Sequence, residues 1–323
     1  MTTSTTAKSA NPVSSGLKTS KLWAYLQMMR PANILTAWTD ILLGYAASGL
    51  ALVSLSGPID WEIAVPLGWL LLSTTGLYGG GVVFNDVFDA DLDAEERPER
   101  PIPSGRSSVR ESVGLGVALL LLGIVSAAQV SLTSAGLAGF IALAALCYDA
   151  AAKHNSFLGP LTMGLCRGAN LLLGMSVLPL AVQTRWVLAL IPIVYIAAIT
   201  TISRGEVHGG KKSTGFVALA MLTVVIVAML GLGFFPGGSL RSYDWLSALP
   251  FTSLFGLMVV PTFVRAALEP TAEQIRAAVK AGIICLIILD SAIAAGFTNW
   301  VYGLAVLGFL PISRGLAKLF AVT

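Results

Sequence analysis

The stretch TGFVALAMLTVVIVAMLGLGFFP, residues 214–236, contains no charged side chain and is long enough to cross a lipid bilayer. Similar apolar segments recur along the chain, at 33–55, 64–84, 111–131, 133–151, 157–183, 185–203, 246–268 and 278–298. A spanning helix requires about 20 mainly apolar residues. The pattern therefore predicts an all-α, multi-pass transmembrane helical bundle of about nine spans, with residues 299–320 as a candidate for a short tenth.

The overall composition favours the same class. Hydrophobic residues make up 55% of the 323 positions, and only 37 side chains are charged, 20 Lys or Arg and 17 Asp or Glu. This charged fraction is less than half of that in soluble domains, so a soluble globular protein is excluded. The net charge of +3 is small and no run of Lys or Arg is present, so we expect no nucleic-acid partner.

The basic residues indicate how the chain is oriented. Residues 1–20 are rich in Ser, Thr and Ala without an apolar h-region, so we expect a disordered cytosolic tail followed by a single transmembrane domain over 21–323. With that tail in the cytosol, all Lys and Arg except Arg185 and Arg241 fall near cytosolic segments. The four long polar loops, and any chemistry, are then expected on the cytosolic side; they are residues 85–110, 152–156, 203–213 and 268–280.

Residues 84–106, FNDVFDADLDAEERPERPIPSGR, directly follow the second apolar segment. On a helix, Asp86, Asp89 and Asp93 lie within about 60° of one another, and Asn85 widens the arc to about 100°. Carboxylates on one stripe repel each other unless a cation lies among them, and such hard oxygen ligands suit Mg²⁺ held through substrate phosphates. We therefore predict that these four side chains bind Mg²⁺ together with a polyanion.

Three arginines follow in the same segment, Arg97, Arg100 and Arg106. Guanidinium groups match phosphate oxygens in geometry and charge, so these side chains are candidates for substrate binding. The alternative interpretation is a solvated loop beside the membrane, in which the acids and the arginines simply pair with each other.

The pattern N-D-x-x-D-x-x-x-D at residues 85–93, followed by R-P-x-R-P-I-P-S-G at 97–105, resembles the first aspartate-rich motif of the UbiA superfamily of intramembrane prenyltransferases. The segment R-P-A-N-I-L-T-A at 30–37 is similar to the Arg-Pro entrance of that family. The resemblance implies an enzyme that transfers an isoprenyl group from a polyprenyl diphosphate, such as geranylgeranyl diphosphate, to an aromatic or other lipophilic acceptor. It also implies Mg²⁺-assisted release of diphosphate, catalytic roles for the aspartates, and membrane lipid as surroundings.

Polar residues of the first span are further candidates for substrate binding. Arg30 stands at its entrance, and Asn33 and Asp40 lie two turns apart on one helix face. Because an ionisable residue within a membrane is a functional-site hypothesis by default, Asp40 is a candidate for lining the acceptor pocket. The alternative for Asp40 is a carboxylate that is hydrogen-bonded inside the bundle. Arg167, in the fifth span, needs an anion or several carbonyl groups for the same reason.

Residues 147–155, C-Y-D-A-A-A-K-H-N, resemble the Tyr/Lys element of the same family. The resemblance implies that Lys153 is a catalytic residue that contacts the diphosphate and that Tyr148 helps to bind the substrate. The spacing departs from the family, because Tyr148 and Lys153 are one residue further apart than in Y-x-x-x-K. The alternative for Lys153 is a helix-end lysine that membrane topology alone would place there.

Residues 201–212, T-I-S-R-G-E-V-H-G-G-K-K, stand where the family has a second acidic motif that resembles D-x-x-D-V-E-G-D. Only Glu206 keeps a carboxylate, so it is the candidate metal ligand here, and Arg204 and His208 are candidates for substrate binding. The resemblance implies two Mg²⁺ ions that share one diphosphate. The second ion is then held weakly, is bound with the help of His208, or is absent.

Two other classes of function compete with the enzyme. One is a noncatalytic protein that binds isoprenoid lipids, which the depleted second motif favours. The other is a carrier in which Asp40, Glu206 and Asp290 handle protons or ions, although no repeat pattern supports it. The S-R-G-E-V-H-G-G variant of the second motif resembles a UbiA-like branch found in bacteria, so we expect an inner or photosynthetic membrane with the active site facing the cytosol.

Overall fold

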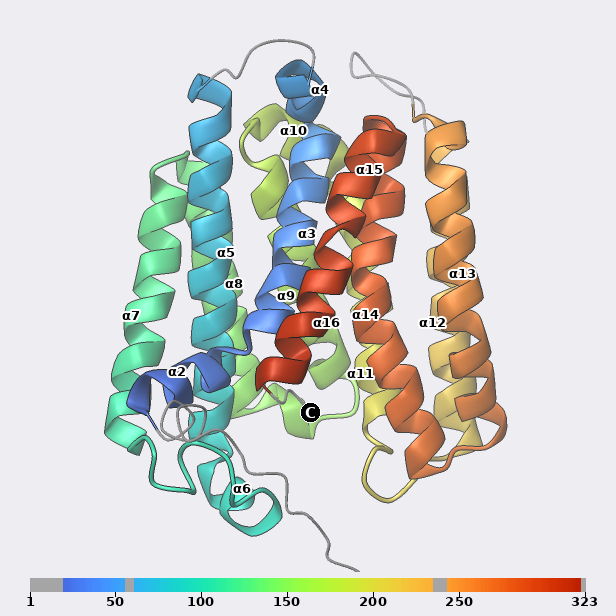
Figure 1. Ribbon diagram of the computed structural model, residues 1–323. Helices are drawn as coiled ribbons and strands as arrows, with labels where there is room; N and C mark the ends of the chain where they lie inside the picture. The colour runs from blue at the N-terminus through green and yellow to red at the C-terminus, as the bar shows by residue number, and fades with distance from the viewer. Residues whose placement is uncertain (1–19, 56–60, 235–242, 321–323) are drawn as a thin grey trace, which may run out of the picture.

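The computed structural model describes residues 20–55, 61–234 and 243–320 (Figure 1). Every regular element in these ranges is helical, so the predicted all-α class is confirmed. The longer helices are α3 (Pro31–Ser48), α5 (Trp61–Phe88), α7 (Val109–Ala128), α8 (Leu132–Ala150), α9 (Leu158–Met175), α11 (Leu190–Ser203), α12 (Lys212–Gly231), α13 (Trp245–Leu268) and α14 (Ala272–Phe297). The shorter elements are α2 (Lys21–Met29), α4 (Leu50–Leu55), α6 (Ala90–Glu96), α10 (Pro179–Arg185), α15 (Trp300–Leu307) and α16 (Phe309–Phe320), with 3₁₀ turns η1 (Ala152–His154), η2 (Trp186–Ala189) and η3 (Leu232–Phe234). The predicted tail, apart from Ser20, lies outside the described residues.

Eight helical segments of the described chain are long and apolar enough to cross a membrane. Three of them combine consecutive elements: α10 with η2 and α11, α12 with η3, and α15 with α16. Helices α3 and α9 have 18 residues each and are not among the eight, because their polar side chains lower their mean hydropathy. The prediction of about nine spans agrees with this count, and the candidate tenth span, at 300–320, meets the same criteria.

The outer helices expose large apolar side chains that a soluble protein would bury. Leu121, Leu132, Val227 and Leu257 are each more than half exposed. Exposed apolar surface of this extent marks a contact with membrane or protein. These helix faces therefore suit the acyl chains of a bilayer.

The two least apolar long helices, α3 and α9, lie against each other in the middle of the bundle (Figure 1). A Cβ atom at Gly44 would collide with the carbonyl oxygen of Leu171 and lie 2.6 Å from the backbone nitrogen of Met175. Gly174, on α9, meets the backbone of Ile41 just as closely. Small residues of this kind allow helix backbones to touch inside a membrane. The polar side chains of α3 and α9 are thereby held within reach of each other.

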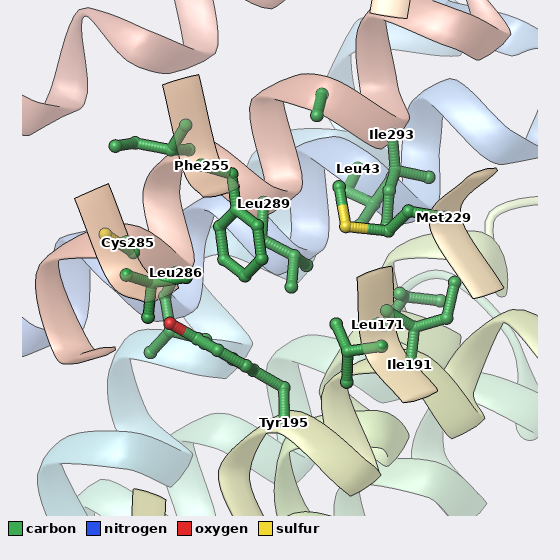
Figure 2. Packing of buried hydrophobic residues seen from close by; sticks show 14 of the residues in the cluster. Leu43, Leu171, Ile191, Tyr195, Met229, Phe255, Cys285, Leu286, Leu289 and Ile293 are labelled. Atoms are coloured by element: carbon green, nitrogen blue, oxygen red, sulfur yellow. The ribbon is translucent and has the colours of Figure 1, made fainter. Parts of the chain in front are cut away.

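A large apolar core fixes the second half of the bundle around α14, as Figure 2 shows. The buried ring of Tyr195, on α11, lies 5.3 Å from the ring of Phe255, on α13, measured between centroids. The Tyr195 hydroxyl donates a hydrogen bond of 2.8 Å to the carbonyl oxygen of Gly282, on α14. One side chain therefore connects three helices, and its own hydroxyl is paired within the apolar interior.

The four polar loops meet at one end of the bundle, where α6 also lies (Figure 1). Three contacts join these loops in series: the ion pair of Lys153 with Asp89, the hydrogen bond from Arg204 to the carbonyl oxygen of Asn155, and the hydrogen bond from the Gly210 nitrogen to the carbonyl oxygen of Pro270. The prediction that these loops share one side is therefore confirmed.

Candidate active site

The acidic segment begins on the last turn of α5 and continues beyond it. Helix α5 ends at Phe88, so Asn85 and Asp86 belong to it, whereas Asp93 belongs to α6. Helical hydrogen bonding still runs through the junction, because the Asp89 nitrogen donates to the Asn85 carbonyl and the Asp93 nitrogen donates to the Asp89 carbonyl. The predicted stripe of carboxylates therefore persists across two helices.

Arg100 bridges two of the aspartates. Its Nη1 atom lies 2.6 Å from Asp93 Oδ2 and 3.4 Å from Asp86 Oδ1. The shared guanidinium group shows that Asp86 and Asp93 face the same side, as the helical period predicted. Both carboxylates are buried, at 5% and 4% exposure. Acids and arginines do pair, as in the alternative interpretation, but the pairs are buried instead of solvated.

Arg30 adds a second cation to Asp86, with Nη2 placed 2.9 Å from Oδ1. Arg30 joins α2 to α3 with a φ of 51°, the sole positive φ among the described residues other than glycine. A left-handed conformation at a residue other than glycine costs about 1–3 kcal/mol, and such strain is concentrated at functional sites. The next residue, Pro31, occupies the first turn of α3, where proline needs no amide hydrogen. The Arg-Pro entrance therefore aims a guanidinium group at the acidic segment.

The loop that carries the arginines is fixed at its far end. Ser108 caps α7 through a capping box with Glu111, and Gly105 turns the chain with a φ of 72°. Arg106 donates to Gln27 Oε1, on α2, at 2.9 Å and to Ser104 Oγ at 2.9 Å. Arg106, a predicted substrate-binding residue, is therefore engaged in holding the loop against α2.

Lys153 reaches the acidic segment from η1, where it forms an ion pair with Asp89. Tyr148 is half-buried one turn earlier, on α8. The longer spacing between the two residues is accommodated because α8 ends at Ala150 and the chain continues as a 3₁₀ turn. The structure thus brings Lys153 to the aspartates, and its contact with a diphosphate stays a prediction.

Arg204 and Glu206 directly follow α11, which ends at Ser203. Arg204 donates to the carbonyl oxygen of Asn155 and, at 3.1 Å, to Ser156 Oγ, so it fastens its loop to residues 152–156. Burial raises the pKa of Glu206, and the nearby charges of Arg97 and Arg276 oppose that rise. Arg97 therefore lies close enough to connect the acidic segment with the second motif electrostatically.

Among the described residues, no hydrogen bond or ion pair links the remaining candidates to the acidic segment. His208 is exposed on the loop that follows α11, and Asn33 is half-buried in the first turn of α3. Arg167 lies inside the bundle, where its Nε atom is 2.6 Å from Asp40 Oδ2, and it also donates to the carbonyl oxygen of Thr36. Asp40 is fully buried, so the alternative interpretation of a carboxylate bonded within the bundle describes its surroundings.

One buried carboxylate at the site, Asp149, was not singled out in the sequence. Asn85 Nδ2 donates to its Oδ1 atom at 3.0 Å, and Asp149 is 4% exposed. A charged residue directly after Tyr148, in an otherwise apolar helix, was the available signal. Its pairing with Asn85 could not be predicted from the sequence, because 64 residues separate the two.

The donors at this end of the bundle are hard oxygens, which suit Mg²⁺. Within 20–55, 61–234 and 243–320, no three Asp, Glu, His or Cys side chains converge closely enough to hold a metal by themselves. Mg²⁺ is usually bound through one or two carboxylates together with substrate phosphates, and it seldom requires an all-protein cage. The residues present therefore fit an ion that is shared with a polyanion.

Residues 42–287, about three quarters of the chain, match the UbiA prenyltransferase family. The chain belongs to this family. It is therefore an integral membrane protein and a UbiA-type prenyltransferase, as the sequence predicted. The family assignment gives no support to the carrier interpretation.

Two curated relatives carry the name digeranylgeranylglyceryl phosphate synthase. The protein of Methanothrix thermoacetophila is 33% identical over 222 residues, which cover 64% of this chain and 77% of the relative. The protein of Ignicoccus hospitalis is 30% identical over 208 residues, and the chain spans 65% of its length. Both relatives are archaeal and lend no support to a bacterial or photosynthetic membrane.

Solved structures of the family share the fold. A UbiA homolog from Aeropyrum pernix aligns with a TM-score of 0.60 at 20% identity, covering 79% of this chain and 96% of that one. A UbiA homolog from Archaeoglobus fulgidus bound to GPP and Mg²⁺ aligns with a TM-score of 0.57 at 15% identity, covering 88% of this chain and 99% of that one. The arrangement of helices described above is thus that of the family.

Proposed function

We propose that this prenyltransferase binds a polyprenyl diphosphate at the end of the bundle that carries α6, and transfers its isoprenyl group to a lipid acceptor. One observation supports this most strongly: three buried or half-buried aspartates alternate there with three cations, Arg30, Arg100 and Lys153. A diphosphate can replace the carboxylates as the partner of these cations, because Arg and Lys form charge-assisted hydrogen bonds with the oxygen atoms of both groups.

The side chains of the site would divide the work between the two partners. The two guanidinium groups and the lysine ammonium group would hold the diphosphate, and the released carboxylates of Asp86, Asp89 and Asp93 would hold Mg²⁺ with Asn85. When bound, Mg²⁺ supplies positive charge that stabilises the leaving diphosphate. The same cationic side chains stabilise the negative charge that grows on the bridging oxygen as it departs.

The reaction breaks the bond between the allylic carbon and the diphosphate oxygen, and both electrons leave with the oxygen. The apolar bundle keeps water away from the allylic cation. The acceptor oxygen then forms the new carbon–oxygen bond and gives up its proton to solvent or to the departing diphosphate. We propose the hydroxyl group of a prenylated glyceryl phosphate as this acceptor, because the curated relatives are named for a product with two prenyl groups on glyceryl phosphate.

The site is proposed to face the cytosol, because the four polar loops at this end carry ten of the 20 Lys and Arg residues and basic residues concentrate on cytosolic loops. Glu206 lies near Arg97, and its effect on a bound diphosphate would pass through this arginine. A protein that binds isoprenoid lipids without reacting is the second candidate, favoured by the single carboxylate in the second motif.

The test is an assay of the purified protein in lipid nanodiscs with Mg²⁺ and radiolabelled geranylgeranyl diphosphate. The acceptors compared are geranylgeranylglyceryl phosphate and 4-hydroxybenzoate. Product with the glyceryl phosphate and not with the aromatic acid supports the proposal. Transfer to the aromatic acid alone would overturn the acceptor assignment, and binding of the donor without diphosphate release would indicate the noncatalytic protein.

A further inference from the structure

Asp149 determines how the amide group of Asn85 is oriented. An ionised carboxylate accepts hydrogen bonds and donates none, so the NH₂ group of Asn85 faces Asp149 in the 3.0 Å bond between them. The amide oxygen of Asn85 is attached to the same carbon atom and therefore points away from Asp149. That oxygen is the atom of Asn85 that can bind a cation.

Asp149 lies among the charges of the candidate site. The charges of Lys153, Asp89 and Arg30 all act on its carboxyl group. Its hydrogen bond to Asn85 joins the end of α8 to the last turn of α5. Lys153 lies shortly after Asp149 in the chain, in η1. The residue is nevertheless outside the predicted set of ligands, and it forms no three-carboxylate cluster with that set.

We propose that Asp149 is a positioning residue, which holds the amide oxygen of Asn85 toward the cation of the diphosphate site. The inference rests on the proposed function, because it takes that cation as given. Groups behind a metal ligand fix its orientation, and their loss lowers metal affinity about 10- to 100-fold. The contribution is large in this chain because the second motif offers Glu206 as its sole carboxylate.

A direct role for Asp149 as a ligand makes a different prediction from a positioning role. In D149N the amide oxygen can still accept from Asn85, so the orientation of Asn85 is kept while the negative charge is lost. In D149L the acceptor is removed, while the branching at Cγ is kept because two methyl groups replace the two oxygens. A positioning residue tolerates the first change and not the second, whereas a metal ligand is damaged by both.

The experiment measures Mn²⁺ binding by electron paramagnetic resonance, with inorganic diphosphate present, for the purified full-length chain in detergent. We expect D149L to weaken Mn²⁺ affinity about 10- to 100-fold and D149N to stay near the wild type. In an N85A background, D149L should cause no further loss, because its effect passes through Asn85. D91N, at an exposed position of the same segment, is the matched control.

Several outcomes would overturn the inference: unchanged affinity in D149L, equal losses in D149N and D149L, or a full additional loss in the N85A background. Thermal unfolding of each variant establishes that it is folded, and D149A replaces D149L if the larger side chain prevents folding. If the wild type binds no Mn²⁺ in the presence of diphosphate, the proposed function itself fails. If the wild type binds Mn²⁺ and D149L binds it equally well, the inference on Asp149 fails alone.

Discussion

Arg167 Nε lies 2.6 Å from Asp40 Oδ2, and this ion pair joins α9 to α3 in the interior of the bundle. Asn170 Nδ2 donates to the same carboxylate oxygen at 2.9 Å. Asp290, on α14, accepts from Thr39 Oγ1 at 2.5 Å and completes a polar group shared by three helices. These side chains explain why α3 and α9 are less apolar than the outer helices.

Removal of Arg167 should destabilise the protein strongly. R167M leaves the buried Asp40 carboxylate without its cation, and breaking a buried pair in this way costs about 3–5 kcal/mol. The double variant R167M/D40L should recover part of that loss, because the stranded charge is removed as well. The measurement is reversible unfolding in detergent micelles; additive losses in the double variant would contradict this account.

Close contact between α3 and α9 should make Gly44 intolerant of any side chain. In G44A the new Cβ atom meets the backbone of α9, and such overpacking costs about 1–3 kcal/mol. Gly136 is the matched control, because a Cβ atom there has nothing within 4 Å. G136A should leave the stability unchanged or raise it by up to about 1 kcal/mol through helix propensity. Equal thermal stability of G44A and G136A would refute the close contact.

Replacement of Lys153 should weaken binding of the donor substrate. K153M removes one charged hydrogen bond to the diphosphate, which is worth about 1.5–3 kcal/mol, or roughly 10- to 150-fold in kcat/KM. K153R should retain part of the activity because it keeps the charge. The exposed Lys318 provides a control, since K318M removes the same charge from the surface of α16. A kcat/KM for K153M that matches the value for K318M would remove Lys153 from the site.

The sequence predicted the helices, and the gathering of the polar loops at one end of the bundle, better than it predicted which residues contact each other. Hydropathy located the spans, and the helical period placed Asp86 and Asp93 on one face, where Arg100 now bridges them. Both signals are local, since they depend on residues within a few turns of each other. The polar helix α3 was still located because Asp40 is its only charged residue and apolar side chains surround its other polar positions.

Contacts between distant segments could not be predicted in the same way. Arg30 and Asp86 are 56 residues apart, and Asn85 and Asp149 are 64 apart. A period states which face of a helix a side chain occupies, but the partner on that face depends on how the helices pack. Arg106 and Arg204 are examples. Both lie at the end of the bundle that carries the acidic segment, but their hydrogen bonds hold loops in place.

The central claim is that the aspartates after α5 support Mg²⁺-dependent departure of diphosphate. The most direct measurement compares diphosphate release by D86N and D91N at saturating acceptor, with Mg²⁺ and with excess EDTA. Both variants lose one negative charge from the same segment, but Asp86 is buried in the ion pairs whereas Asp91 is exposed. We predict that D91N releases diphosphate at the wild-type rate and that EDTA stops this release. Release by D86N should be slower by about 100-fold or more. Equal release by D86N and D91N, or release that continues in EDTA, would contradict the account.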